Sequence, residues 1–275
     1  MIEIIVFIFG VVIGSFLNVC IYRLPRKESI VFPPSRCTSC YNKIKTYHNI
    51  PIFGYLYLKG KCSNCSEKIS IMYPVVELLS GLLALFLYLK FGLTLNFFSY
   101  LTLCLALVVV TFIDMKFMII PNSITFPGIL VGFLFAAAKT DWGIFPDMVS
   151  TVSLENFGGM VSSIEFLNSL FGIIMGGGIL FSIAYVYKLI RKIDGMGMGD
   201  IKLLAMLGAF LGADGVVFII FISSLIGTVV GVSLMIYNKG NLKYAIPYGP
   251  FLSLAAIIYI FTGGLTPIIA KIFQV

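Results

Sequence analysis

Charged side chains are scarce in this 275-residue chain, in which Asp, Glu, Lys and Arg together make up 11% of the sequence. Hydrophobic residues account for 59%, and the mean hydropathy is +1.04. This composition excludes the soluble globular classes and is typical of a protein that crosses a membrane several times. The features of a removable signal peptide are also lacking, because Glu3 stands where a basic region would precede the first apolar run and no small-residue cleavage pattern follows it.

The basic excess, a formal net charge of +7, is unevenly distributed. All Lys and Arg residues except three lie in segments 23–72, 114–116, 188–202 and 238–243. Segment 139–165 instead carries four acids against one Lys. Under the positive-inside rule we expect the basic segments in the cytoplasm and the acidic segment on the opposite side. The net charge therefore indicates topology, and we expect no nucleic-acid partner.

The apolar residues form eight runs, each of which we expect to be a transmembrane helix. Crossing a hydrocarbon core of about 30 Å takes roughly 20 residues at about 1.5 Å per residue. Run 200–213 is the shortest, so its first residue can lie below the membrane surface. The runs are 4–21, 73–89, 93–113, 118–138, 164–187, 200–213, 216–237 and 247–270.

Four of the six cysteines form two Cys-x-x-Cys pairs in the basic segment 23–72. The pairs are Cys37 with Cys40 and Cys62 with Cys65. Two such turns at this spacing are typical of a zinc ribbon, since four thiolates close a tetrahedron around one ion. Two disulfides or a thiol redox pair are the alternatives, although a cytoplasmic position argues against disulfides. A metal would also stabilise a segment too small to bury much core.

The expected fold is therefore an all-α polytopic membrane protein of about eight transmembrane helices, with a small cytoplasmic zinc-ribbon-like insert after the first helix. We expect the first helix within residues 1–22, the insert within 23–72 and a seven-helix membrane core within 73–275.

Two acids stand at the ends of separate apolar runs. Asp114 follows run 93–113, and Asp200 follows the glycine-broken stretch Gly197-Met198-Gly199. Ionisable residues at membrane depth usually mark functional sites, and the expected topology puts both acids at the same membrane face. Two carboxylates that meet share a proton and can activate water and a carbonyl group for hydrolysis. The alternatives are that each Asp only caps a helix at the interface and that the glycines only allow close helix packing.

Two other polar residues interrupt apolar runs. Asn18 is either a helix–helix hydrogen-bonding residue or part of a site. Glu77 is either a carboxylate favoured by the N-terminus of its helix or part of a pocket at the cytoplasmic edge. Both are candidates for binding a cofactor.

Taken together, the motifs resemble those of the prepilin leader peptidase/N-methyltransferase family, the bifunctional type IV prepilin peptidases of the GxGD aspartic protease class. The resemblance covers nearly the whole chain. The matching stretches are Gly14-Ser15-Phe16-Leu17-Asn18-Val19-Cys20-Ile21-Tyr22-Arg23-Leu24-Pro25, the two Cys-x-x-Cys pairs, Asn49-Ile50-Pro51, Lys59-Gly60-Lys61-Cys62, Tyr73-Pro74-Val75-Val76-Glu77-Leu78, Asp114 with Ile120-Pro121, Gly197-Met198-Gly199-Asp200, and Ile246-Pro247-Tyr248-Gly249-Pro250-Phe251.

The resemblance implies a multi-pass enzyme of the bacterial inner membrane whose active site faces the cytoplasm. Asp114 and Asp200 would be the catalytic pair, with Gly197, Gly199 and Lys202 in the active-site loop. The enzyme would remove the basic leader from type IV prepilins or pseudopilins and then methylate the new N-terminal residue, usually Phe, with S-adenosylmethionine. The zinc-ribbon-like segment is associated with the longer, bifunctional members. Anionic membrane lipids are the expected partners of its basic residues.

The chain departs from the family pattern at two positions. Asn122 follows Ile120-Pro121 where an acid is common, so no catalytic role is carried over to it. Tyr248 stands where many members have Phe. The alternatives are a peptidase of the preflagellin type without methyl transfer, and a non-enzymatic membrane assembly or zinc-binding protein.

Overall fold

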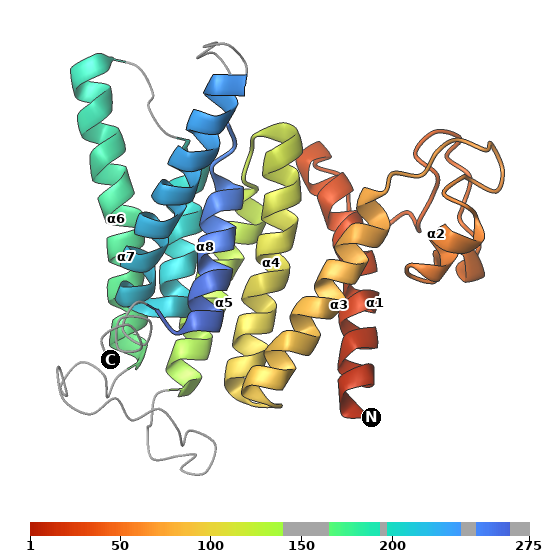
Figure 1. Ribbon diagram of the computed structural model, residues 1–275, viewed down its shortest axis with the longest axis horizontal. Helices are drawn as coiled ribbons and strands as arrows, with labels where there is room; N and C mark the ends of the chain where they lie inside the picture. Colours follow the sequence, from red (N-terminus) through yellow and green to blue (C-terminus); the bar gives the residue numbers. More distant parts are fainter. Residues whose placement is uncertain (140–164, 193–196, 238–245, 265–275) are drawn as a thin grey trace. The chain divides into compact units, whose positions relative to one another are not determined.

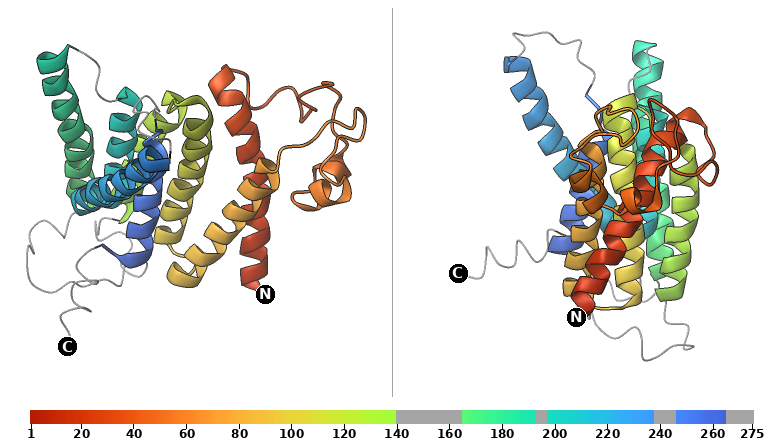
Figure 2. Two further views of the ribbon diagram at one scale, coloured as in Figure 1. Left: turned by 45° about the horizontal axis from the view of Figure 1, so that its top comes forward. Right: turned by 90° about the vertical axis from the view of Figure 1, so that its right-hand side faces the viewer.

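The computed structural model describes residues 1–139, 165–192, 197–237 and 246–264. Its regular elements are helices, and two isolated β-bridges are the only strand-like pairs recorded among these residues. The chain divides into two compact units, Met1–Ile113 and Asp114–Val275. The helix α4 (Leu95–Phe117) contains the boundary between them. Figures 1 and 2 show the helices in sequence colours.

In the first unit, α1 (Ile2–Arg23) packs closely along α3 (Met72–Phe91), and Figure 1 shows the two side by side. Glycines make the close approach possible. A Cβ on Gly10 would lie 2.7 Å from the Cβ of Ala84, and one on Gly14 would lie 2.7 Å from the Cα of Glu77. Because later positions on α1 meet earlier positions on α3, the two helices are antiparallel.

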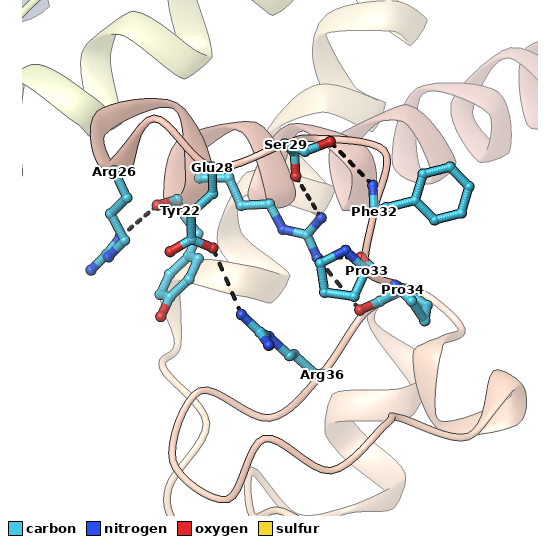
Figure 3. Close-up of polar contacts among 9 residues, drawn as sticks. Tyr22, Arg26, Glu28, Ser29, Phe32, Pro33, Pro34 and Arg36 are labelled. Carbon is cyan, nitrogen blue, oxygen red and sulfur yellow. Dashed lines mark hydrogen bonds and ion pairs between the residues drawn. The ribbon is translucent and has the colours of Figure 1, made fainter.

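In the sequence, residues 24–71 connect α1 to α3, and we call them the cysteine-bearing segment. They include the short helices η1 (Leu24–Arg26), η2 (Thr46–Asn49) and α2 (Phe53–Tyr57). Arg23, only 6% exposed, anchors the first loop of the segment. Its guanidinium donates to the carbonyl oxygens of Ser29 at 2.8 Å and Pro33 at 2.7 Å. Figure 3 shows this loop and the Glu28–Arg36 ion pair, whose atoms are 3.9 Å apart. The buried Arg therefore fixes where the segment leaves α1.

In the second unit, the central helix α7 (Met198–Tyr237) packs against α5 (Asn122–Lys139), α6 (Glu165–Arg191) and α8 (Gly249–Thr262). The first half of α7 is buried on every side, since Leu203, Leu204, Met206 and Leu207 are all 0% exposed. The backbones of α6 and α7 nearly touch where Gly172 meets Gly208, and a Cβ on either would overlap the other's backbone.

Helix α7 is broken at Gly212, where φ is 72° and ψ is −174°. Glycine adopts this conformation at little cost. The polar groups freed by the break are satisfied from α6, because Asn168 Oδ1 accepts the Ala213 N–H at 3.0 Å and the Ser169 hydroxyl donates to the Ala209 carbonyl at 2.7 Å. The runs predicted at 200–213 and 216–237 are the two halves of this helix.

Six described helices are long and apolar enough to cross a membrane, and α8 is a shorter apolar helix. Since α7 is two helical halves, the count is close to the expected eight, and the all-α membrane fold is confirmed. Exposed apolar side chains recur on α7 at helical spacing, as on a surface that faces lipid. They are Val217, Phe221, Leu225 and Val229. The predicted acidic loop and the basic segment 238–243 lie outside the described residues, apart from the ends of the loop.

Candidate active site

Asp114 lies in the last turn of α4, because that helix continues one turn beyond the predicted apolar run, to Phe117. Its side chain is 5% exposed. Its Oδ2 accepts a hydrogen bond of 2.9 Å from the backbone N–H of Gly249, the first residue of α8. A helix N-terminus favours a carboxylate. Helix α8 therefore binds and orients Asp114, although the two are far apart in sequence.

Asp200 lies in the first turn of α7, where its backbone N–H donates to the Gly197 carbonyl at 3.1 Å. Its side chain is half-buried and is within electrostatic range of Asp114. A Cβ on Gly197 would lie 3.4 Å from Asp200 Oδ2, so this glycine lies directly beside the carboxylate. The structure thus brings together the two acids that sequence reasoning paired.

Ile120, in the connection between α4 and α5, separates the starts of α7 and α8. A Cβ on Gly199 would lie 2.9 Å from the Cβ of Ile120, and one on Gly249 would lie 3.4 Å from its Cδ1. Both helix starts therefore pack on one apolar side chain, and a glycine at each contact allows it. The Ile120-Pro121 motif does not by itself predict this spacer, because both of its contacts are with residues distant in sequence.

Lys202 lies two residues after Asp200, and its ammonium group interacts with α5. Nζ donates to Asn122 Oδ1 at 2.9 Å and lies 5.2 Å from the centre of the Phe126 ring. None of the ion pairs among the described residues joins it to an acid. Lys202 therefore ties the start of α7 to the start of α5, and the position where the family often has an acid supplies a neutral acceptor.

The turn before α8 is held by a contact that sequence reasoning missed. The Tyr248 hydroxyl lies 2.8 Å from the Ser223 hydroxyl on the second half of α7. Tyr248 directly precedes Gly249, which donates to Asp114. The available signal was the Pro247-Tyr248-Gly249-Pro250 motif, but the sequence does not show that its partner is Ser223.

The cysteines of the first unit form a cluster built from two similar turns. In each turn the first Cys accepts at its carbonyl from the residue four positions later, at 3.0 Å for both Cys37 and Cys62. An isolated antiparallel bridge flanks each turn, and both turns contain a residue with positive φ, Tyr41 at 59° and Ser66 at 58°. The two Cys-x-x-Cys pairs are therefore presented by the same backbone arrangement.

The four sulfur atoms of Cys37, Cys40, Cys62 and Cys65 lie within 4.8 Å of one another, and all four cysteines are free thiols. The Sγ atoms of Cys37 and Cys65 are 3.8 Å apart. Tetrahedral zinc with Zn–S bonds of about 2.3 Å puts its sulfur ligands about 3.8 Å apart. The pKa of Cys62 is lowered to about 7 by hydrogen bonds from the backbone N–H groups of Cys65 and Asn64. The donor set fits a structural metal ion.

Asn18 and Glu77, the two candidates for cofactor binding, both lie in the first unit. Asn18 is 2% exposed and its Nδ2 donates to the Tyr73 carbonyl at 3.0 Å. Glu77 is 6% exposed and its Oε2 accepts the backbone N–H of Ile52 at 2.7 Å. The link between Glu77 and the cysteine-bearing segment was not predicted.

Comparisons with known proteins agree with this architecture. Residues 8–91 match the Bacterial Peptidase A24 N-terminal domain, and residues 101–232 match the Type IV leader peptidase family. No solved structure gives a significant match.

Curated relatives named prepilin leader peptidase/N-methyltransferase match almost the full length of the chain. The protein of Pseudomonas putida is 30% identical over 93% of this chain and 89% of its own length. Those of Aeromonas hydrophila and Neisseria gonorrhoeae are 32% and 34% identical, over 94% and 93% of this chain and 90% and 88% of their own lengths. The chain belongs to the prepilin leader peptidase/N-methyltransferase family.

Proposed function

We propose that this protein is an aspartic endopeptidase that removes the basic leader from type IV prepilins or pseudopilins, and that it then methylates the new N-terminal residue with S-adenosylmethionine. Asp114 and Asp200 are the catalytic pair. The observation that carries the proposal is that the two acids lie at ends of apolar helices in the same unit, and that Gly199, next to Asp200, and Gly249, which donates to Asp114, both pack on Ile120. The names of the relatives support both activities.

The chemistry needs only the two carboxylates and water. One ionised carboxylate accepts a proton from water as the water attacks the scissile carbonyl, and the other, protonated, donates to the carbonyl oxygen. The hydrogen bond from Gly249 orients Asp114, and the packing of Gly199 on Ile120 fixes the start of α7. Lys202 holds the same helix start through Asn122.

We propose that the active site faces the cytoplasm of a bacterial inner membrane. The basic segments support this orientation through the positive-inside rule. A prepilin carries a basic leader before an apolar helix, so the helix can enter from the lipid while the cleavage site stays at the interface. The basic segment 23–72 suits anionic lipid headgroups better than a basic leader.

Zinc is the metal we propose for Cys37, Cys40, Cys62 and Cys65. Four thiolates saturate a structural zinc ion, which would fix the fold of the segment and take no direct part in either reaction. Folding of so small a segment would then depend on the metal.

The test is to incubate the detergent-purified protein with a synthetic prepilin and S-adenosylmethionine and to weigh the products by mass spectrometry. We expect loss of the leader and a methyl increment on the new N-terminus. Asp114→Asn and Asp200→Asn should each abolish cleavage. Asp214→Asn, which changes another acid of α7, is the matched control and should cleave normally.

The outcomes separate the parts of the proposal. Cleavage without methylation would leave a peptidase alone. Normal cleavage by either Asn variant at the pair would refute the catalytic roles of these acids.

A further inference from the structure

We propose that Glu77 is the catalytic base of the methyl transfer and that Asn18 orients the amine to be methylated. This inference rests on the proposed methyltransferase function. It places the methyl-transfer site where the end of α1 and the start of α3 meet the Ile52 loop, in the unit that also carries the four cysteines.

The antiparallel packing of α1 and α3 places the two residues about one helical turn apart along the contact. Asn18 lies beside Tyr73, and Gly14, one turn earlier on α1, lies against Glu77. Helical side chains tilt toward the N-terminus of their own helix. Asn18 therefore leans toward the level of Glu77, and Glu77 leans toward the level of Asn18.

Asn18 and Glu77 together have more buried hydrogen-bond acceptor positions than the surrounding residues have donors for them. Asn18 Oδ1 is buried and has no hydrogen-bond partner among the described residues. Glu77 receives the Ile52 N–H and a hydrogen bond from the Ser15 hydroxyl, whereas an ionised carboxylate offers about four acceptor positions. None of the recorded ion pairs of the described residues involves Glu77. Unpaired acceptors in an apolar setting are costly, and a ligand that only donates, such as an ammonium group, would satisfy them.

The loop that touches Glu77 is itself held in an unfavourable conformation. Ile52 has φ of 62°, which is costly for a β-branched residue. Its N–H nevertheless points at the Glu77 carboxylate. Backbone strain of this kind is concentrated at functional sites. The contact also gives Glu77 a fixed position on the edge of the cysteine-bearing segment.

The proposed reaction is balanced by one proton acceptor. The new N-terminal ammonium gives a proton to Glu77 and becomes an amine. The lone pair of the amine forms a bond to the methyl carbon of S-adenosylmethionine, and the carbon–sulfur bond breaks with its electrons going to sulfur. The products are a methylated ammonium and a neutral thioether, and Glu77 returns its proton to water.

The test uses Glu77→Gln in the full-length protein and a synthetic peptide that already lacks the leader and begins with Phe. Gln can still accept the Ile52 N–H, so this variant keeps the loop contact and removes only the base. We expect the methylation kcat at pH 7 to fall about 100-fold or more, as for the loss of a general base. Cleavage of a prepilin and the affinity for S-adenosylmethionine should stay within about threefold of wild type, because the fold and the donor site are unchanged. Glu67→Gln, at an exposed carboxylate of the same unit, is the matched control.

A pH series separates a base from a purely structural residue. An N-terminal amine has a pKa of about 8, so a growing fraction of the peptide needs no base as the pH rises from about 7 to 9. The rate of Glu77→Gln relative to wild type should therefore recover over this range. A deficit that is constant with pH, or normal methylation by Glu77→Gln, would overturn the proposal. If the wild-type protein itself fails to methylate the peptide, the methyltransferase function falls and this inference falls with it.

Discussion

Replacing Gly249 with Ala is a sharp test of the Asp pair, because the structure leaves no room for one methyl group at this position. The new Cβ would lie 2.7 Å from Oδ2 and 3.3 Å from Cγ of Asp114. The glycines recorded with positive φ do not include Gly249, so Ala should fit its backbone. The contact with Asp114 is then the main effect. The carboxylate must move and lose the N–H hydrogen bond, which as a bond to a charged group contributes about 1.5–3 kcal/mol. If that energy positions Asp114 for hydrolysis, leader cleavage should slow by about 10- to 100-fold.

The assay is single-turnover cleavage of a synthetic prepilin by the purified variant. Gly227→Ala is the matched control, because Gly227 faces the same helix α8 but a Cβ there would lie 3.6 Å from Phe251, an ordinary contact. We expect Gly227→Ala to keep the wild-type melting temperature and activity, and Gly249→Ala to remain folded, with a melting temperature lowered by a few degrees, but to lose activity. A Gly249→Ala protein that keeps at least half the wild-type rate would refute the role assigned to this contact.

Three further predictions concern the Tyr248 hydroxyl, the cysteine cluster and the contact of α6 with α7. Tyr248→Phe removes the hydroxyl that meets Ser223, which is a loss of about 1 kcal/mol, and should reduce the cleavage rate by about two- to fivefold; unchanged cleavage would remove Tyr248 from the support of Asp114. The purified protein should contain one zinc ion. Because all four thiols must lose their protons to bind it, zinc affinity in a chelator competition should fall continuously as the pH is lowered from about 8 to 6, and the lowered pKa of Cys62, about 7, makes this thiol a ligand that protons displace late. An affinity that does not change with pH would contradict the thiolate site. Gly208→Ala should force α6 and α7 apart and lower the melting temperature, whereas Gly178→Ala, with nothing within 4 Å of its Cβ, should not.

Local features of the sequence were enough to predict most of the helices and the two turns that present the four clustered cysteines. The length of an apolar run sets the length of the helix it forms. Runs 73–89 and 93–113 therefore correspond to α3 and α4, with ends shifted by a few residues. Each Cys-x-x-Cys pair lies within one turn and can be predicted from the sequence around it. The contact between the two turns joins residues distant in sequence and cannot be predicted in this way.

Features that depend on partners distant in sequence could not be predicted. The break in α7 at Gly212 was expected as a turn between two helices, but Asn168 and Ser169 of α6 satisfy the freed backbone groups and keep the halves together. The contact of Gly249 with Asp114 joins residues 135 positions apart, and nothing near either residue indicates it. The same holds for Ile52 and Glu77, because the strained loop is positioned by the segment around it.

The position of Asp114 bears on the alternative that the two acids only cap helices. A carboxylate is favoured at a helix N-terminus and disfavoured at a C-terminus, where the last carbonyl groups carry partial negative charge. Asp200, in the first turn of α7, could serve as a capping residue, but Asp114, in the last turn of α4, cannot stabilise its own helix in this way. It is also nearly buried and within electrostatic range of Asp200. The N-terminus of α8 offsets part of this cost by donating to Asp114, and Asp200 lies in the first turn of α7, where the helix dipole favours a carboxylate. We infer that two helix starts are directed at one pair of acids because the pair must carry negative charge during the reaction, which a capping role alone would not require.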